Sequence, residues 1–225
     1  MSMSLKIQVA IIDFGMGNLF SIKRACEHAG LRAVITCDST DLLKSDAVIL
    51  PGVGAFGDAM ESIESLDLVN PIKEFINTGK PFMGICLGMQ LLLTESKEFG
   101  VYKGLDVISG SVERFLPKNN TGKKVKVPQT GWNRLAKPAE KNNSWNNSPL
   151  EGIEEGVFMY FVHSYYVVPK SQECILSYTD YEGVQYCSSL KQKNIFACQF
   201  HPERSSIQGL KIYENWAKEV GDARQ

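Results

Sequence analysis

The chain has 225 residues, 44% of them hydrophobic, which is enough for one large domain with a substantial core. Its formal net charge of −1, without a long basic run, argues against nucleic acid or an anionic membrane as the main partner. No apolar segment approaches the roughly 20 residues that span a bilayer, and the first residues lack the apolar core of a signal peptide. We therefore expect a cytoplasmic protein with one domain over residues 1–225.

The first hundred residues alternate between strand and helix patterns. This rhythm predicts βαβ units and an α/β fold with a mixed, mostly parallel central sheet flanked by helices. Ligands of such sheets bind beyond the carboxyl ends of the strands. Strands are expected at 7–14, 33–37, 47–50 and 82–85, and helices at 18–29, at 57–77 with a break near Pro71, and from Leu87 to about Ser96.

The second half has shorter apolar runs and more polar connections. Residues 118–126 and 137–149 are polar and are expected to be exposed loops. Ser205 is a plausible N-cap for the last helix. Strands, mostly antiparallel, are expected at 107–115, 156–168, 174–179, 185–190 and 194–200, followed by a helix at 207–220.

A short apolar run ends in Gly-Ile-Cys86-Leu-Gly and is followed at once by a helical pattern. This is typical of a nucleophile elbow, in which the nucleophile lies on a sharp turn between a strand and a helix. Gly84 and Gly88 flank the turn because side chains there would crowd it. A helix N-terminus favours the thiolate form of such a cysteine. The alternative is an inert cysteine in the core.

Far downstream, His201-Pro-Glu203 supplies a candidate base. The chain has only three histidines, and this one precedes a glutamate by two residues. In extended chain these positions share a face, and Pro202 disfavours helix. The glutamate can therefore orient the imidazole, as in a catalytic triad. The alternative is a surface histidine beside a salt-bridging glutamate.

The Gly52-Val-Gly54-Ala-Phe-Gly57 segment follows the strand at 47–50 and matches the GxGxxG pattern of dinucleotide sites. It follows the third strand rather than the first, and no acidic residue ends the next strand, so we favour another role. Attack on an amide creates an oxyanion that needs backbone N–H donors. The segment Pro51–Gly54 and the amide of Leu87 are placed to supply them.

Six scattered cysteines contain no CxxC pair, so neither a disulfide framework nor a zinc site is expected. The cysteine elbow, the Pro-Gly-Val-Gly segment and His-Pro-Glu together resemble the class I (triad) glutamine amidotransferases. The likeness spans almost the whole chain in order. It is strongest to the glutaminase subunits of imidazole glycerol phosphate synthase, through Asp13–Leu19, Leu50–Gly57, Met83–Gln90, Gly131–Asn133, Tyr160–Tyr166 and Gln199–Ser205.

The resemblance implies the flavodoxin-like fold of that family and hydrolysis of glutamine to glutamate and ammonia without a cofactor or metal. Cys86 would be the nucleophile, His201 the base and then the acid, and Glu203 its orienting partner. Val53 and Leu87 would supply the oxyanion amides after a peptide flip. Ammonia would pass to a separate (β/α)8-barrel synthase of the HisF type. Substrate binding is implied for Gly52, Gly54, Gln90, Ser164 and Tyr165.

One departure concerns the loop that faces the synthase in this family. It usually contains His-Met-Gly-Trp, whereas this chain has Gln129-Thr130-Gly131-Trp132. The change is either drift in a tolerant loop or the mark of a paralogue that supplies ammonia to an acetamidino-sugar pathway of the cell surface. Further alternatives are a free-standing cysteine amidohydrolase and a catalytically silent binding protein that only activates a partner. Of the remaining aromatic residues, Trp145 is expected at the surface, and Trp216 in the core. His163 is expected to be buried beside the site.

Overall fold

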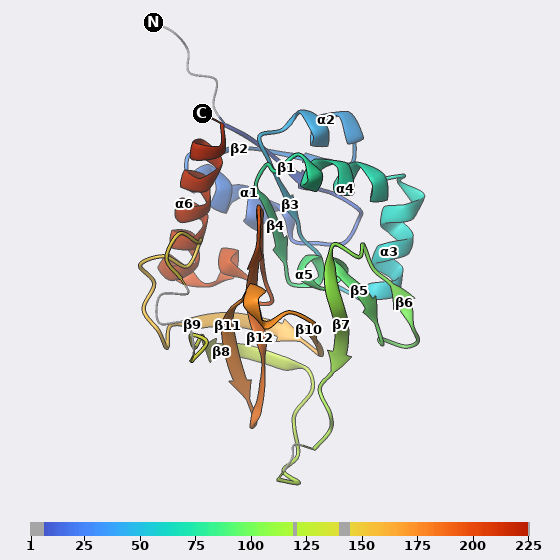
Figure 1. The fold of residues 1–225 in the computed structure, drawn as a ribbon, viewed down its shortest axis with the longest axis vertical. Helices are drawn as coiled ribbons and strands as arrows, with labels where there is room; N and C mark the ends of the chain where they lie inside the picture. Colours follow the sequence, from blue (N-terminus) through green and yellow to red (C-terminus); the bar gives the residue numbers. More distant parts are fainter. Residues whose placement is uncertain (1–6, 119–120, 140–144, 225) are drawn as a thin grey trace, which may run out of the picture.

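The computed structural model describes residues 7–118, 121–139 and 145–224. Its centre is an 11-stranded mixed sheet in the order β2-β1-β3-β4-β13-β12-β10-β7-β5-β6, with β11 paired to β12 outside this path. A second, two-stranded sheet is formed by β8 (Gln129–Arg134) and β9 (Phe158–His163). Figure 1 shows the parallel strands in the upper part of the molecule and the antiparallel strands below them. The expectation of a mixed sheet flanked by helices is confirmed.

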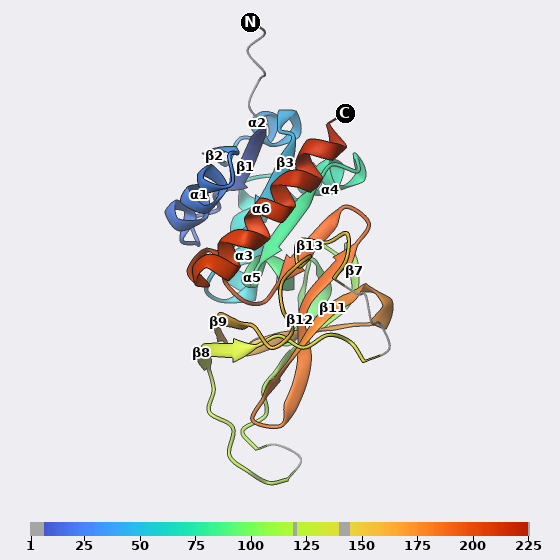
Figure 2. The ribbon, with the colours of Figure 1, turned by 90° about the vertical axis from the view of Figure 1, so that its left-hand side faces the viewer.

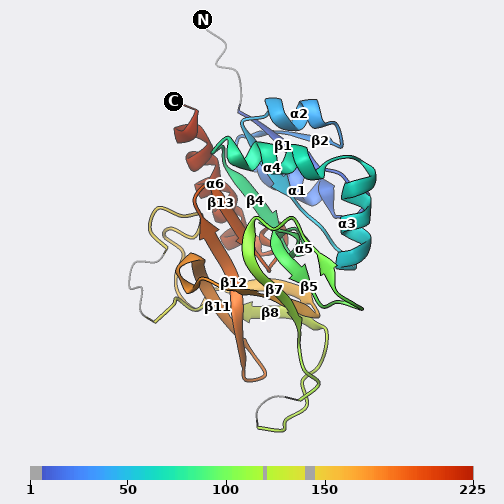
Figure 3. The same ribbon diagram turned by 45° about the vertical axis from the view of Figure 1, so that its right-hand side comes forward.

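The parallel part consists of β1 (Gln8–Ile12), β2 (Arg32–Thr36), β3 (Ala47–Leu50) and β4 (Phe82–Ile85). Alternate residues of these strands enter two apolar clusters, one on each face of the sheet. The helices α1 (Leu19–His28) and α6 (Ser206–Ala223) contact each other, and Figure 2 shows them on one face. The helices α2 (Ser39–Lys44), α3 (Phe56–Ser65) and α4 (Val69–Asn77) appear on the other side in Figure 3.

The strand β13 (Ile195–Cys198) joins the two parts of the sheet. It is parallel to β4 on one side and antiparallel to β12 (Val184–Gln192) on the other. Beyond β12 lie β10 (Tyr165–Pro169) and β7 (Ile108–Arg114), which pair with each other in antiparallel fashion, and β11 (Ile175–Tyr181) pairs with β12 after the short η1 (Gln172–Cys174). The antiparallel pairing expected for this half is confirmed, except that β13 and β7 each also pair in parallel with one neighbour. The strand expected at 156–168 is divided at Ser164 between the two sheets.

The helix expected from Leu87 to about Ser96 is wrong over its second half. The helix α5 (Leu87–Leu91) ends early, and residues Leu93–Ser96 form β5, which pairs with β7 and with β6 (Tyr102–Lys103). The apolar run is short enough to satisfy either period, and long-range pairing decides it. The break expected near Pro71 also lies earlier, at residues 66–68, so Pro71 stands in the first turn of α4, where its missing N–H is tolerated.

Two further expectations were wrong. The helix α2 was missed, although Asp38 caps it by accepting from the amides of Thr40 and Asp41. Trp145 is buried rather than exposed, and its indole N–H donates to the Leu176 carbonyl at 2.7 Å. The residues around Trp145 are polar, so composition alone suggested exposure. Ser148–Leu150 are buried together with it. Residues 119–120 and 140–144 of the expected loops lie outside the described residues.

Candidate active site

The sharp turn expected between a strand and a helix is present at Cys86. The strand β4 ends at Ile85, α5 begins at Leu87, and Cys86 between them has φ 54° and ψ −107°. A non-glycine residue in this region of φ/ψ space is strained and occurs mainly where surrounding structure enforces it. Here the Cys86 amide donates to the Cys198 carbonyl at 2.8 Å, which ties the turn to β13.

Glycine is required beside the turn. A Cβ on Gly88 would overlap the carbonyl oxygen of Leu50, and a Cβ on Gly84 would lie 3.1–3.2 Å from Gly88, Leu92 and Ala197. The carboxyl end of β3 therefore touches the backbone of α5 directly. This close approach brings the segment after β3 next to Cys86.

His201 and Glu203 form a buried pair, with His201 Nδ1 2.8 Å from Glu203 Oε1, and His201 interacts electrostatically with Cys86. The contact is as expected, but its geometry is not that of extended chain. Glu203 lies in a 3-10 turn, η2 (Pro202–Arg204), which follows β13, and Pro202 is tolerated at its first position. The turn, rather than the period of a strand, returns the carboxylate to the imidazole.

The charge state of His201 is set by its neighbours. Burial by itself lowers the pKa of His201, but electrostatic attraction to Cys86 and the hydrogen-bonded Glu203 carboxylate outweigh it and raise the pKa to about 10. The imidazole is therefore protonated at neutral pH. Gln199 donates to the Cys86 sulfur at 3.5 Å, and the sulfur also lies 3.9 Å from the Val162 carbonyl.

Ser205 was expected to cap the last helix, but its hydroxyl forms hydrogen bonds to other backbone groups. It makes no cap hydrogen bond, and instead donates to the His201 carbonyl at 2.6 Å and accepts from the Tyr160 amide at 3.0 Å. The His201 amide in turn donates to the Tyr160 carbonyl at 2.9 Å. The turn that carries His201 and Glu203 is thereby fixed to β9 (Phe158–His163).

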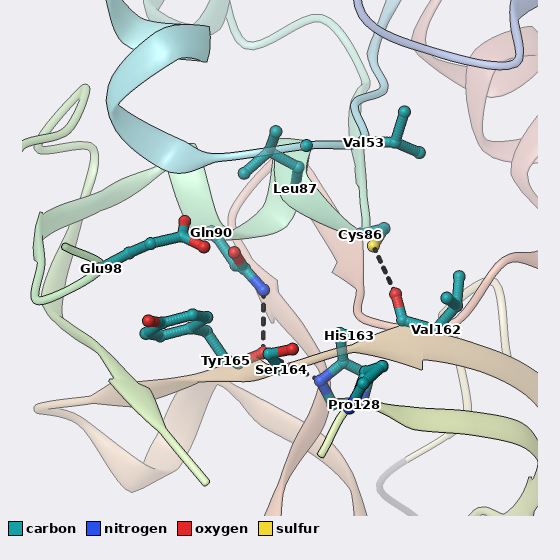
Figure 4. A pocket seen from close by; sticks show the side chains of 11 residues that line it. Val53, Cys86, Leu87, Gln90, Glu98, Pro128, Val162, His163, Ser164 and Tyr165 are labelled. Carbon is teal, nitrogen blue, oxygen red and sulfur yellow. Dashed lines mark hydrogen bonds between the residues drawn. The ribbon is translucent and has the colours of Figure 1, made fainter.

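A cavity of about 310 Å³ opens beside Cys86. Figure 4 shows Cys86 on one wall and Gln90, Ser164 and Tyr165 on the others. Seven residues expected in the site line it, and four further lining residues were missed as site residues. The expected residues are Val53, Gly54, Cys86, Leu87, Gln90, Ser164 and Tyr165, and the additional ones are Glu98, Pro128, Val162 and His163.

Among the described residues, Glu98 is the one carboxylate in the lining of this cavity. Its Oε2 accepts from the Phe56 amide at 2.7 Å, and burial raises the pKa of its carboxyl although this hydrogen bond opposes the change. A single buried glutamate has no sequence signal of its own, because Glu98 lies just after β5, a strand that the sequence did not predict. Gln199 was missed for the same kind of reason, since only the fold brings it to Cys86.

The expected oxyanion donors are near Cys86, but one is occupied. The Leu87 amide donates to the Gly52 carbonyl at 3.3 Å, and Gly52 itself is not part of the cavity lining. Val53 is 42% exposed at the mouth. In this conformation the carbonyl of Gly52, rather than an N–H, points to the position where an oxyanion forms.

The segment expected to be a partner-facing loop is a strand. Gln129, Thr130, Gly131 and Trp132 belong to β8 (Gln129–Arg134), which pairs with β9. Gln129 at the start of this strand is buried, whereas Trp132 is 53% exposed. None of the four lines the cavity, although the adjacent Pro128 does.

The motifs of this site occur together in a known family. The family described as Glutamine amidotransferase class-I matches residues 10–220. The chain belongs to this family. This membership accounts for the cysteine elbow and the His-Pro-Glu turn on one sheet.

Among curated amidotransferases, the chain is 44% identical over 214 residues to the imidazole glycerol phosphate synthase subunit HisH of Geobacter sulfurreducens, with 94% of this chain and 98% of that protein covered. It is 44% identical over 215 residues to HisH of Aquifex aeolicus, with 95% and 98% covered. Within the class I amidotransferases it therefore belongs with the HisH subunits.

Solved structures agree on the fold. A putative GMP synthase protein from Thermoplasma acidophilum is similar with a TM-score of 0.69 at 17% identity, covering 98% of this chain and 96% of that one. PurLQS from Thermotoga maritima is similar with a TM-score of 0.66 at 18% identity, covering 98% and 100%. Among the described residues, no helix is long and apolar enough to cross a membrane, and no group of three or more His, Cys, Asp or Glu side chains is arranged to hold a metal ion.

Proposed function

We propose that this protein is the glutaminase subunit of an imidazole glycerol phosphate synthase in histidine biosynthesis. It hydrolyses L-glutamine to glutamate and ammonia and delivers the ammonia to a (β/α)8-barrel partner of the HisF type, which makes imidazole glycerol phosphate and AICAR. The observation that carries the proposal is the buried His201–Glu203 pair beside Cys86 at the wall of a cavity of about 310 Å³. The HisH relatives support the pathway.

The triad accounts for each proton in the reaction. The Cys86 thiolate attacks the amide carbon of glutamine, and the resulting tetrahedral intermediate collapses as the C–N bond breaks. The His201 imidazolium gives its proton to the leaving nitrogen, so that ammonia departs and a thioester remains. His201 then takes a proton from water as that water attacks the thioester, which releases glutamate and restores the thiolate. Glu203 holds the ring and balances its charge.

The oxyanion needs a rearrangement of the loop after β3. The Leu87 amide is bound to the Gly52 carbonyl, so a rotation of the peptide between Gly52 and Val53 is required to free it and to present the Val53 N–H. One such donor contributes about 3 kcal/mol to the stability of the transition state. The closed arrangement supports a protein with little activity by itself and argues against a free-standing amidohydrolase.

The polar lining of the cavity matches the substrate. Glu98 is suited to the α-ammonium group, since its carboxylate lines the cavity. Ser164 and Tyr165 lie across the cavity from Cys86 (Figure 4), and Gly54 and Gln90 also line it. A glutamine held at its amino-acid end would place its amide at the sulfur. No cofactor is needed for this chemistry.

We place the barrel against the surface formed by Trp132, Tyr160 and Arg204. Trp132 contacts the Tyr160 ring edge-on with centroids 6.0 Å apart, and the Arg204 guanidinium lies 4.3 Å from the centroid of that ring. An exposed aromatic residue with an arginine is typical of an interface anchor. The Tyr160 carbonyl accepts from the His201 amide, so a partner docked here lies one hydrogen bond away from the triad.

We further propose that the chain acts as one domain, in the cytoplasm.

Replacing Cys86 by Ala tests the reaction. We expect glutaminase activity in the presence of a HisF barrel to fall to background, because no other group forms the thioester, while the barrel still binds and still uses free ammonia. Activity is measured as glutamate released, and binding by titration calorimetry. Glutamate release by the Cys86→Ala variant at the wild-type rate would overturn the mechanism.

The same assay decides between the pathways. A HisF barrel of histidine biosynthesis should stimulate wild-type glutamine hydrolysis, whereas a barrel from a surface-sugar cluster should not. Stimulation by the second barrel only would assign the chain to the paralogous pathway and reject the histidine role.

A further inference from the structure

A buried row of polar groups leads from β8 to the wall of the cavity. Gln129 in β8 and His163 in β9 are paired across the two strands. Tyr186 of β12 reaches both: its hydroxyl oxygen lies 3.0 Å from Gln129 Oε1 and 3.2 Å from His163 Nε2. His163 Nδ1 in turn lies 2.8 Å from the Tyr165 carbonyl. All of these side chains are buried, so each proton in the row must have a defined place.

The Tyr165 carbonyl fixes the proton of His163. A carbonyl oxygen only accepts, so Nδ1 must carry a hydrogen, since a bare nitrogen 2.8 Å away would repel it. Burial lowers the pKa of His163 to about 4, a backbone hydrogen bond opposes this, and the positive His201 adds to it. The ring is therefore neutral and has one N–H, at Nδ1. Its Nε2 is left as a bare acceptor.

The bare Nε2 of His163 determines the direction of the next two hydrogen bonds. Tyr186 has one hydroxyl proton, and it must point to Nε2. The Tyr186 oxygen then faces Gln129 at 3.0 Å with lone pairs only, so Gln129 must donate. The Thr179 hydroxyl, another polar neighbour of Tyr186, gives its own proton to the Arg134 carbonyl at 3.0 Å.

A half-turn of the Gln129 amide group satisfies this requirement. In the structure Gln129 Oε1 faces the Tyr186 hydroxyl, and Gln129 Nε2 is buried without a hydrogen-bond partner among the described residues. The two ends of an amide have almost the same shape, so their exchange needs no other movement. Exchange gives the nitrogen a partner and leaves an oxygen unpaired, which a buried carbonyl tolerates better than a buried N–H.

We propose that Gln129 is a positioning residue: its amide N–H holds the Tyr186 hydroxyl, which donates to His163 Nε2 and so keeps the ring donating from Nδ1 to the carbonyl of Tyr165, a residue that lines the glutamine cavity. The role of the cavity rests on the proposed glutaminase function; the proton arrangement does not. The residue at 129 must therefore be a donor, which makes this position a determinant of substrate seating rather than a tolerant surface site.

The Tyr165 carbonyl is where the row meets the catalytic groups. It accepts from His163 Nδ1 at 2.8 Å and from Gln90 Nε2 at 2.9 Å, which uses both of its lone pairs. Gln90 Nε2 also donates to Gln199 Oε1 at 3.0 Å, and Gln199 Nε2 donates to the Cys86 sulfur. Figure 4 shows the hydrogen bond between Gln90 and this carbonyl. Removing the donor at 129 is therefore expected to disturb substrate binding near Tyr165 more than the hydrogen bond to the Cys86 sulfur, which lies further along the row.

The tautomer is measured directly by long-range ¹⁵N–¹H correlation NMR on the full chain at pH 7. The chain has three histidines, so assignment by single substitution is practical. We expect His163 to show a protonated Nδ1 and an unprotonated Nε2. An Nε2–H tautomer or an imidazolium at His163 would overturn the inference, and neither result depends on activity or on a partner.

Kinetics then test the positioning role, with barrel-saturated enzyme. Gln129→Met keeps the length of the side chain and removes the donor, and Tyr186→Phe breaks the same row from β12. We expect both to raise KM for glutamine about three- to tenfold with a smaller change in kcat. The matched control is Gln185→Met, the same change at the exposed neighbour of Tyr186, which should leave KM unchanged.

These outcomes separate the two proposals. If Gln129→Met and Tyr186→Phe lower the melting temperature but leave KM at the wild-type value, Gln129 is merely structural and the inference fails. If the wild type has the expected tautomer but hydrolyses no glutamine with its barrel, the proposed function fails and the proton arrangement stands. Should Gln129→Met not fold, Tyr186→Phe and the wild-type tautomer still decide the question.

Discussion

The two sides of the cavity are stabilised in different ways. The first, here called the catalytic side, comprises the loop after β3, the Cys86 turn after β4 and the turn after β13 that carries His201 and Glu203. The second, the strand side, comprises β8, β9 and the start of β10. Close backbone contact and opposite charges hold the catalytic side, whereas a row of neutral hydrogen bonds holds the strand side.

The two histidines show what this difference means. His201 and His163 are both buried, yet the pKa of His201 is raised to about 10 and that of His163 is lowered to about 4. Burial disfavours the charge in both cases. His201 has the Cys86 sulfur and the Glu203 carboxylate as neighbours, whereas His163 has a carbonyl and a hydroxyl. The groups that contact a buried histidine therefore decide its charge. The charge in turn decides whether the ring can act as an acid or only form fixed hydrogen bonds.

The largest effect outside the triad is expected on the catalytic side, from Gly88→Ala. The added Cβ would overlap the Leu50 carbonyl, and backbone on both sides leaves no room to yield. We expect the free energy of unfolding to fall by about 3 kcal/mol, measured by denaturant titration. Gly221→Ala is the control, since its Cβ would lie 3.7 Å from Ile7 in an ordinary contact. Equal stability of the two variants would contradict the close-contact account.

The strand side should make the free energy of unfolding depend on pH in the acid range. Because the pKa of His163 is lowered in the folded state, the unfolded chain binds a proton below about pH 6.5 that the native chain binds only near pH 4. Stability should therefore fall as the pH falls through this window, by about 3 kcal/mol in total. His201 stays protonated in the folded chain throughout this range and gains its proton in the unfolded chain near pH 6.5, so above about pH 5.5 it adds a slope of opposite sign that the wild type and a His163 variant share.

The measurement is the free energy of unfolding between pH 7 and pH 4 for the wild type and for His163→Gln. The variant lacks the titrating group, so its stability should depend less steeply on pH across this range. Identical slopes in the two proteins would mean that His163 is not held neutral.

The smallest effect is expected at the exposed edge of the strand side, from Trp132→Ala. Trp132 is 53% exposed, so its loss should leave the melting temperature almost unchanged. Affinity for the HisF barrel should fall by about 1–2 kcal/mol, read from titration calorimetry. Leu66→Ala, at an exposed apolar residue between α3 and α4, is the control and should bind normally. Unaltered affinity of Trp132→Ala would move the docking surface elsewhere.

What the sequence could predict depends on how far apart the interacting residues are. The elbow at Cys86, the glycines beside it and most of the alternation of strands and helices up to Ile85 follow local rules of backbone geometry, and these are found in the structure. The strand β5 and the burial of Trp145 were not predicted, because pairing with β7 and a hydrogen bond to Leu176 decide them. Glu98 and Gln199 enter the site for similarly non-local reasons.

The amino-acid sequence by itself placed this chain among the class I glutamine amidotransferases, because the turn at Cys86, the His-Pro-Glu step and the glycine segment each have a local signature. Only the tertiary structure decided the charge of its two buried histidines and the position of Gln129. Position 129 had the appearance of a surface loop, and pairing of β8 with β9 turned its side chain into the interior beside Tyr186. Proton placement depends on which groups meet across strands, and the contact between Gln129 and Tyr186 joins residues 57 positions apart.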